Sequence, residues 1–208
     1  MPWTNTHELL RVQTPRLVLR CWTLGDVPAM LAAIEASVDH LRPWLPWAAH
    51  EPEPAERKEA LVRRFQRNFQ LGRDLVYGIF HGGDGGVVGG CGIHRRIGAG
   101  AAEIGYWISA DRINQGYATE ASAALVHIGF ERLGLHLIEV HCDQANAPSA
   151  AVPRKLGFEK LAPIPGWISE PGAAPRDTVI FRMTRAQYRA SPAAQVQVNS
   201  SGEPGGGS

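Results

Sequence analysis

The chain has 208 residues, of which 44% are hydrophobic, so it is long enough to form one domain with a substantial core. Its 21 Lys and Arg residues almost balance its 20 Asp and Glu residues, which gives a formal net charge of +1. This charge supplies no basic field for nucleic acid or anionic lipid, so we expect no nucleic-acid partner and no membrane partner.

The three cysteines, Cys21, Cys91 and Cys142, are far apart and indicate neither a disulfide framework nor a metal site. We interpret them as buried thiols in a reducing compartment. The N-terminus has no basic region followed by an apolar run, and no segment approaches the ~20 apolar residues that a membrane span requires. The sequence therefore predicts a cytoplasmic protein without a metal.

The first part of the chain predicts a strand and two helices with an irregular connection between the helices. Residues 16–22 alternate like a half-buried strand, and residues 23–26 form a helix-start signal before an apolar stretch at 27–34. The connection at 41–48 contains two prolines and two tryptophans, so it cannot continue as a long helix. Residues 54–71 carry apolar residues at helical spacing, which predicts an amphipathic helix on the outside of the domain.

The middle of the chain predicts three strands joined by glycine-rich turns, at residues 75–81, 87–97 and 102–109. Consecutive strands with such turns form an antiparallel meander.

Helices and strands alternate in the last part of the chain. The prediction is a helix at 117–133, a strand at 137–142, a short helix at 148–156 and a last strand at 177–183. Two parallel strands need a long crossover, so this order implies one parallel pair. We therefore expect an α+β fold with a mixed, mostly antiparallel sheet flanked by helices.

We divide the chain into an N-terminal extension at 1–13, a domain at 14–190 and a tail at 191–208. Beyond Ala190 the sequence consists mainly of Ser, Pro, Ala, Gln and Gly, with few core-forming residues. That composition predicts a disordered tail.

The turn at residues 113–119 precedes the long predicted helix and consists largely of small or polar residues. N–H groups at a helix start have no partners inside the helix, and the helix dipole adds positive charge, so this turn predicts a phosphate or pyrophosphate site. Gly116 permits positive φ and close approach of a ligand, and Ala118 is small for a related reason. The alternative is an ordinary glycine turn before an amphipathic helix.

Four sequence segments occur in a characteristic order: Thr14 to Arg20, Glu103 to Ile108, Gln115 to Ala121, and Asn146 to Ser149 followed by Lys155 to Phe158. This ordered set resembles the GNAT superfamily of acyl-CoA-dependent N-acyltransferases, and within it the branch that acetylates the N-termini of ribosomal proteins. The resemblance implies a central strand pair that splays apart, leaving a cleft where thioester and amine meet.

The resemblance also implies acetyl-CoA as co-substrate. Its pyrophosphate would lie on the main-chain N–H groups of residues 115–119, and its pantetheine arm would run beside the strand that ends at Ser109. Where the family usually has Gln or Arg, this chain has Ile113, and the neighbouring Arg112 is expected to substitute for it. The expected coenzyme-binding residues are Trp107, Ile108, Ser109, Arg112, Gln115, Gly116, Tyr117, Ala118, Thr119 and Asn146.

Acetyl transfer to an amine requires a neutral amine, a stabilised oxyanion and a protonated thiol. An α-amino group has a pKa of ~8, so a carboxylate that accepts its proton would help at neutral pH. The resemblance points to Glu103 as this base or as a substrate-orienting group; the alternative is a salt-bridged strand carboxylate. Ser149 would donate a proton to the departing thiolate; the alternative is that it only caps the helix. A backbone N–H near Ile108 would polarise the thioester carbonyl.

Two tryptophans of the 41–48 connection are candidates for the acceptor site. By resemblance, Trp44 and Trp47 line the acceptor pocket, although core packing explains them almost as well. Asn146 has a similar alternative as an ordinary turn residue. We assign no role to His94 or His141.

The leading hypothesis is direct transfer of an acetyl group from acetyl-CoA to a protein N-terminus or a small amine, by a monomer or homodimer. Ile113 and Pro153 depart from the family pattern. They motivate a second hypothesis, a catalytically silent acyl-CoA-binding sensor or interaction module. Acetylation of a drug or toxin is a third possibility, which differs from the first only in its acceptor.

Overall fold

A ten-stranded sheet organises the chain. The computed structural model describes residues 3, 6–168 and 175–200. The strands are β1 Arg11–Gln13, β2 Leu17–Cys21, β3 Asp74–His81, β4 Val87–Gly98, β5 Ala101–Ile108, β6 Leu137–Asp143, β7 Glu159–Lys160, β8 Ile164–Ile168, β9 Arg176–Thr184 and β10 Asn199–Ser200. The α-helices are α1 Val27–Glu35, α2 Val38–Leu41, α3 Ala55–Gln70, α4 Tyr117–His127, α5 Ala147–Lys155 and α6 Arg185–Arg189.

Shorter helical turns connect several of these elements. They are η1 Thr6–Leu9, η2 Leu24–Asp26, η3 Pro46–His50, η4 Ala110–Arg112, η5 Ile128–Arg132 and η6 Pro192–Gln195. The turn η5 is a π-helical continuation of α4, so the single helix that the sequence predicts at 117–133 is essentially confirmed.

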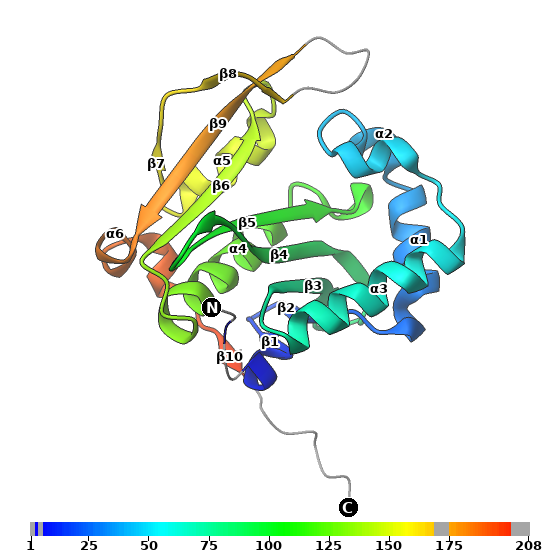
Figure 1. The fold of residues 1–208 in the computed structure, drawn as a ribbon. Helices are drawn as coiled ribbons and strands as arrows, with labels where there is room; N and C mark the ends of the chain where they lie inside the picture. The colour runs from blue at the N-terminus through cyan, green and yellow to red at the C-terminus, as the bar shows by residue number, and fades with distance from the viewer. Residues whose placement is uncertain (1–2, 4–5, 169–174, 201–208) are drawn as a thin grey trace, which may run out of the picture.

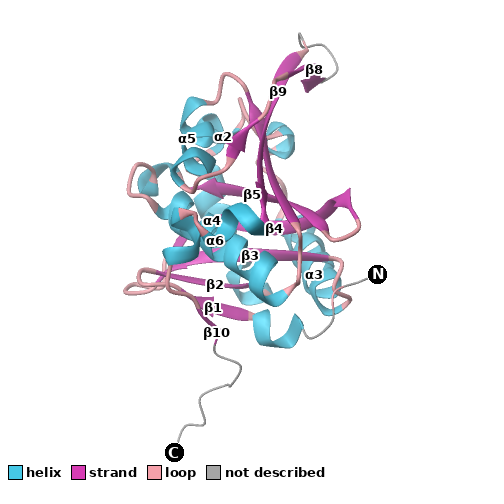
Figure 2. Cartoon of the chain, turned by 90° about the vertical axis from the view of Figure 1, so that its left-hand side faces the viewer, coloured by secondary structure: helices cyan, strands magenta, loops and turns pink. Residues whose placement is uncertain are grey.

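The strands follow the order β10-β1-β2-β3-β4-β5-β6-β9-β7, and β8 pairs with β9. Among the described strands, β5 and β6 form the only parallel pair. Figure 2 shows the strands up to β5 as a stack, with β9 running steeply across it. The predicted α+β fold with a mixed, mostly antiparallel sheet is confirmed.

The parallel pair comes apart after three residues. Ala101, Ala102 and Glu103 pair with Leu137, Ile138 and Glu139, and no pairing follows toward the carboxyl ends of the two strands. Figure 1 shows β5 and β6 diverging from this shared end. We call the unpaired stretch, residues 104–108 of β5 and 140–143 of β6, the strand fork.

Two hydrophobic clusters hold helices on opposite faces of the sheet. The larger cluster contains Leu125 of α4 and Ile104 of β5. The smaller one joins Met30 of α1 and Val62 of α3 to Phe80 of β3. Figure 1 accordingly shows α1 and α3 in front of the sheet and α4 behind it.

The domain is larger than the sequence predicts. Residues 191–200 were expected to begin the disordered tail, but η6 and β10 lie there, and β10 pairs with β1. Ala193 is fully buried, so a few small apolar residues suffice to attach this segment to the core. The expected N-terminal extension likewise contributes β1 to the sheet. Residues 201–208 lie outside the described residues.

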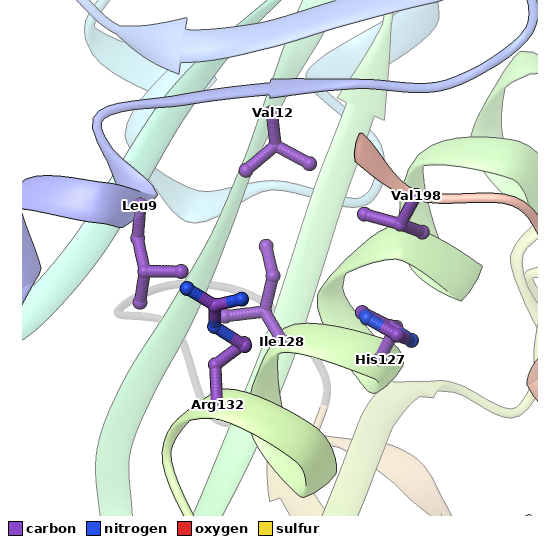
Figure 3. A pocket seen from close by; sticks show the side chains of 6 residues that line it. All are labelled: Leu9, Val12, His127, Ile128, Arg132 and Val198. Atoms are coloured by element: carbon purple, nitrogen blue, oxygen red, sulfur yellow. The ribbon is translucent and has the colours of Figure 1, made fainter. Parts of the chain in front are cut away.

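Described segments from near the N-terminus and the C-terminus meet the end of α4 around a small cavity (Figure 3). Its volume of about 30 Å³ is enough for one water molecule and too small for a coenzyme. It is lined by Leu9, Val12, His127, Ile128, Arg132 and Val198.

Candidate active site

The start of α4 has an unusual backbone. Gly116 occupies the N-cap position with φ of +82° and provides no capping side chain. Two residues earlier Asn114 also has a positive φ, of +59°. Left-handed conformations cost glycine little, so Gly116 is the residue type that this turn requires.

Nothing within the described residues accepts a hydrogen bond from the main-chain N–H groups of residues 116–119. Residues 113–116 are exposed, whereas Tyr117 is buried. Unpaired N–H groups at a helix start carry partial positive charge and favour an anion. The turn that the sequence predicts to bind a phosphate therefore has main-chain donors available for one.

Arg16, a residue that the sequence analysis did not single out as part of the site, holds this turn from the side. Its guanidinium donates to the main-chain oxygen of Gln115 at 2.9 Å and pairs with Glu120 at 2.7 Å. It also lies over the ring of Tyr117, 4.7 Å from the centroid. A Cβ added at Gly116 would come within 3.3 Å of Arg16 Nη2. Arg16, the residue before β2, thus ties the start of that strand to the first turn of α4.

Arg112, which was expected to reach the phosphate, is engaged elsewhere. Its guanidinium pairs with Asp84 at 3.2 Å and with Asp111 at 3.4 Å. A hydrogen bond from the Gly86 N–H and the charge of Arg112 hold the pKa of the Asp84 carboxyl below its usual value. Arg112 therefore connects the β3–β4 turn to η4.

The end of β5 presents main-chain groups to the strand fork. Ser109 donates its N–H to Val88 of β4 at 2.9 Å, so the alternation of an antiparallel ladder turns the N–H and C=O groups of Ile108 and Tyr106 the other way. Within the part of the chain that the structure describes, that edge of β5 has no partner strand beyond Glu103. Of the predicted residues, Ile108 is placed on the open edge, while Trp107 and Ser109 form the ladder with β4.

The start of α5 lies on the other side of the fork and is closed by its own side chains. Asn146 is the N-cap, and its Oδ1 accepts from the Ser149 N–H at 3.0 Å. Ser149 is thus in the first turn and is not the cap. The side-chain amide nitrogen of Asn146 has no partner within the described structure.

Pro153 sits inside α5, where its missing N–H leaves the main-chain oxygen of Ser149 without an intrahelical donor. The Tyr106 hydroxyl donates to that oxygen at 2.9 Å and lies 3.4 Å from Ser149 Oγ. Burial raises the pKa of Tyr106 well above its usual value, so the phenol keeps its proton at neutral pH. Tyr106 thereby links β5 to α5 across the fork.

Glu103 belongs to a row of ionisable side chains across five strands. The register pairs Asp74 with His94, His94 with Glu103, Glu103 with Glu139, and Glu139 with Arg182. Directly paired residues lie on one face of a sheet, so the row occupies a single face. It crosses the sheet at the level where β5 and β6 begin to part.

The face of this row is opposite to α4. Ile104 and Ile108 of β5 pack in the cluster with α4, so Glu103, Gly105 and Trp107 point the other way. The Glu103 carboxylate is 18% exposed, and its ion-pair partner Arg96 lies 3.8 Å away, beyond hydrogen-bond distance. The carboxylate is therefore available to a ligand.

An aromatic pair lies farther along the same face. Trp47 of η3 contacts Trp107 edge to face, with 6.0 Å between ring centroids, and it is 37% exposed. Trp44 is half-buried on the same connection. A Cβ at Gly105 would meet no atom of the described residues within 4 Å apart from its own chain neighbours, so the face of β5 between Glu103 and Trp107 is open there.

The described residues contain no group of three His, Cys, Asp or Glu side chains able to hold a metal ion. Over the same ranges, no helix is both long and apolar enough to cross a membrane. The three cysteines are free; Cys91 and Cys142 are buried and Cys21 is partly exposed.

Residues 16–159 match the family described as the acetyltransferase (GNAT) domain. The chain belongs to this family. It is an acetyltransferase, as the sequence motifs predict, and solved GNAT acetyltransferases share its fold.

Named relatives agree with this membership. YoaA of Bacillus subtilis strain 168, an uncharacterized N-acetyltransferase, is 27% identical over 180 residues, which cover 84% of this chain and 96% of YoaA. YdaF of the same organism, provisionally named a ribosomal N-acetyltransferase, is 25% identical over 155 residues, 74% of this chain and 79% of YdaF. The structure of Mycobacterium smegmatis RimJ in complex with CoA-disulfide has a TM-score of 0.74 and 27% identity, covering 88% of this chain and 90% of RimJ.

Sequence reasoning missed three features of this GNAT site: Arg16, the Tyr106 hydroxyl, and the residue pair Glu139 and His141 taken as one unit. Arg16 was within a quoted motif, but its partner Glu120 is 104 residues away. Alternation along residues 137–142 could have shown that Glu139 and His141 share a face, because they are two residues apart in a strand.

Proposed function

We propose that this protein is an N-acetyltransferase that binds acetyl-CoA across the strand fork and transfers the acetyl group directly to a primary amine. The observation that carries the proposal is the set of unpaired N–H groups at residues 116–119 of the described structure, next to the open edge of β5. The pyrophosphate would accept from the N–H groups of Gln115, Gly116, Tyr117, Ala118 and Thr119.

The pantetheine arm would then extend from this turn along the main-chain groups of Ile108 and Tyr106. An extended amide chain can pair with a free strand edge in the manner of another strand. The side-chain amide nitrogen of Asn146 faces no acceptor among the described residues and would donate to a pantetheine carbonyl. Binding of CoA-disulfide by the similar RimJ supports this assignment.

The chemistry requires no covalent enzyme intermediate. An amine attacks the thioester carbonyl, whose oxygen is polarised by the main-chain N–H of Ile108. Glu103, open on the opposite face of β5, would orient the amine or accept its proton. Ser149, beside the Tyr106 hydroxyl, would donate a proton to the departing thiolate.

For the acceptor, we propose a protein N-terminus, with a ribosomal protein as the leading candidate. The name of YdaF supports the ribosomal class. The open space above Gly105, bordered by Trp107 and Trp47, would admit the end of an extended chain. A ribosomal acceptor would place the reaction in the cytoplasm. A small-molecule amine is the competing acceptor.

A silent binding module is the second candidate. The exposed Ile113 favours it, because the turn lacks the polar side chain usual at that position and Arg112 is engaged with Asp84. The effect of Pro153 does not favour it, since Tyr106 supplies the missing hydrogen bond.

Calorimetry with acetyl-CoA, followed by a thiol-release assay over N-terminal peptides and small amines, separates these functions. The proposal expects saturable binding, acceptor-dependent release of thiol and a mass increase of one acetyl group on the acceptor. Binding without thiol release on any acceptor would indicate the module. Absence of binding would contradict both.

A further inference from the structure

A second titratable group borders the space where the acceptor amine would lie. His141 of β6 places Nε2 2.7 Å from Oε2 of Glu139. Glu139 is nearly buried, with its side chain 4% exposed, and its Oε1 accepts from Arg182 at 2.6 and 2.8 Å. Arg182, Glu139 and His141 thus form a connected chain from β9 to β6.

The register places the His141 ring at the strand fork. Glu103 and Glu139 are the last paired residues of β5 and β6, and two residues farther along each strand stand Gly105 and His141. Both share the face of Glu103, because side chains alternate along strands. Since the strands diverge here and Gly105 has no side chain, the register puts His141 beside the open space above Gly105.

The hydrogen bonds determine which ring nitrogen can accept a proton. A carboxylate can only accept hydrogen bonds, so Nε2 carries the hydrogen that bonds Glu139, and Nδ1 retains its lone pair. Nδ1 has no hydrogen-bond partner among the described residues, and the side chain is 17% exposed. This is the arrangement of an imidazole base oriented by a carboxylate.

Glu103 differs from His141 in this respect. Its carboxylate lies 3.8 Å from Arg96 and makes no hydrogen bond within the described structure, so nothing holds it in one orientation. Carboxylates also have a lower ordinary pKa than imidazole and are weaker bases near neutral pH. Glu103 is better suited to attract an ammonium group than to take a proton from it.

We propose that His141 accepts the proton of the acceptor amine, that Glu139 is its positioning residue, and that Glu103 orients the amine. This inference rests on the proposed acetyl transfer and assigns the proton-accepting role within it. As the N–C bond forms and the C–S bond breaks, the surplus proton on nitrogen passes to His141 Nδ1. The thiolate takes up one proton through Ser149, and exchange with solvent restores both groups.

The charged groups around His141 come from three strands. They are Glu139 and Asp143 of β6, Arg182 and Arg176 of β9, and Glu103 of β5 with its partner Arg96. Asp143 and Arg176 pair with each other at 2.6 Å, so the carboxylate that contacts the ring is that of Glu139.

The decisive variant is His141→Gln, whose amide can still donate to Glu139 and so preserves the buried pair. We expect turnover to fall by roughly 10²- to 10⁴-fold with an unchanged Kd for acetyl-CoA. The acid limb of the kcat/KM against pH profile should disappear. His136→Gln, at an exposed histidine immediately before β6, is the matched control and should retain both rate and profile.

Two further variants test whether His141 acts as a base or only stabilises the structure. Glu139→Gln should keep the geometry but shift the acid limb to lower pH, because the imidazolium loses its carboxylate. Glu103→Gln should raise KM for the acceptor and keep the acid limb. Thermal unfolding of each variant checks the fold.

The inference is overturned if His141→Gln keeps the wild-type rate and acid limb, or if Glu103→Gln is the variant that abolishes that limb. Either result would leave acetyl transfer itself intact. If the wild-type protein releases no thiol with any acceptor, the proposed function has failed instead, and calorimetry of acetyl-CoA separates that outcome from the first.

Discussion

The two helices that begin beside the strand fork, α4 and α5, differ in whether the N–H groups of their first turns are capped. At α5, the Asn146 side chain accepts from the Ser149 N–H at 3.0 Å. At α4, Gly116 offers no side chain and the N–H groups of residues 116–119 have no acceptor in the described structure. The N–H donors at the start of α4 are therefore available to a ligand, whereas the capped N–H at the start of α5 is not.

The two helices also differ in how neighbouring side chains support them. Pro153 removes a donor from α5, and the hydroxyl of Tyr106 replaces it on the Ser149 carbonyl. At α4 the surrounding side chains support the turn from outside: Arg16 binds the Gln115 carbonyl and the Glu120 carboxylate, and neither contact uses an N–H of the turn. The packing thus stabilises the turn while its donors remain free.

The largest effect is expected at Gly116. Gly116→Val forces a β-branched residue into φ of +82° and places its Cβ near Arg16, so acetyl-CoA should bind at least about 100-fold more weakly. Calorimetry measures the loss. Gly134→Val is the control, because Gly134 also has a positive φ, of +67°, but lies beyond the far end of α4. Equal losses of affinity in both variants would mean that backbone strain, not the ligand turn, is responsible.

Next in size is the hydrogen bond across the fork. Tyr106→Phe leaves the Ser149 carbonyl unpaired, which should lower the free energy of unfolding by about 1–2 kcal/mol. In a Pro153→Ala background, the restored main-chain N–H can donate to that carbonyl, so the cost of Tyr106→Phe should shrink by about half or more. Chemical denaturation of the four proteins measures this coupling. Identical costs in both backgrounds would show that Tyr106 does not substitute for the missing N–H.

The cap of α5 can be separated from its proposed ligand role. Asn146→Ala removes both functions and should lower the free energy of unfolding by about 1 kcal/mol while weakening acetyl-CoA binding. Asn146→Asp keeps an acceptor for the Ser149 N–H and loses the donor, so stability should be retained while affinity falls. Denaturation and calorimetry on the same samples give both numbers. Full affinity in Asn146→Asp would restrict Asn146 to capping.

The smallest effect is expected at Arg16. Arg16→Met removes the contacts with Gln115 and Glu120, and because this pair is partly exposed it should weaken acetyl-CoA binding only about 3- to 10-fold. Arg63→Met on α3 is a matched surface control, since Arg63 is 63% exposed with Glu59 at 3.7 Å. If both variants bind equally well, Arg16 does not organise the turn.

Local sequence signals predicted the α4 end of this comparison, because the determinants lie within a few residues. Gly116, the following apolar helix and the preceding strand are contiguous, so the turn and its free N–H groups follow from short-range geometry. The strand fork was predicted by resemblance, and its register could not be obtained from the sequence. The use of Asn146 as the cap was not anticipated, since capping was considered only as the alternative role of Ser149.

The missed features depend on long-range contacts. Arg16 meets Glu120 across 104 residues, and Tyr106 meets Ser149 across 43. The pairing of Glu139 with Arg182 requires the β6–β9 register, which no local pattern specifies. The attachment of β10 to β1 likewise joins opposite ends of the chain, and a composition rule cannot detect it.

The most direct test of the account is a titration of ¹⁵N-labelled protein with coenzyme A, followed by amide chemical shifts. The account predicts that the N–H signals of Gln115 to Thr119 shift most, together with Ile108, while the capped N–H of Ser149 changes little. Saturable binding that leaves the signals of residues 115–119 in place would contradict it.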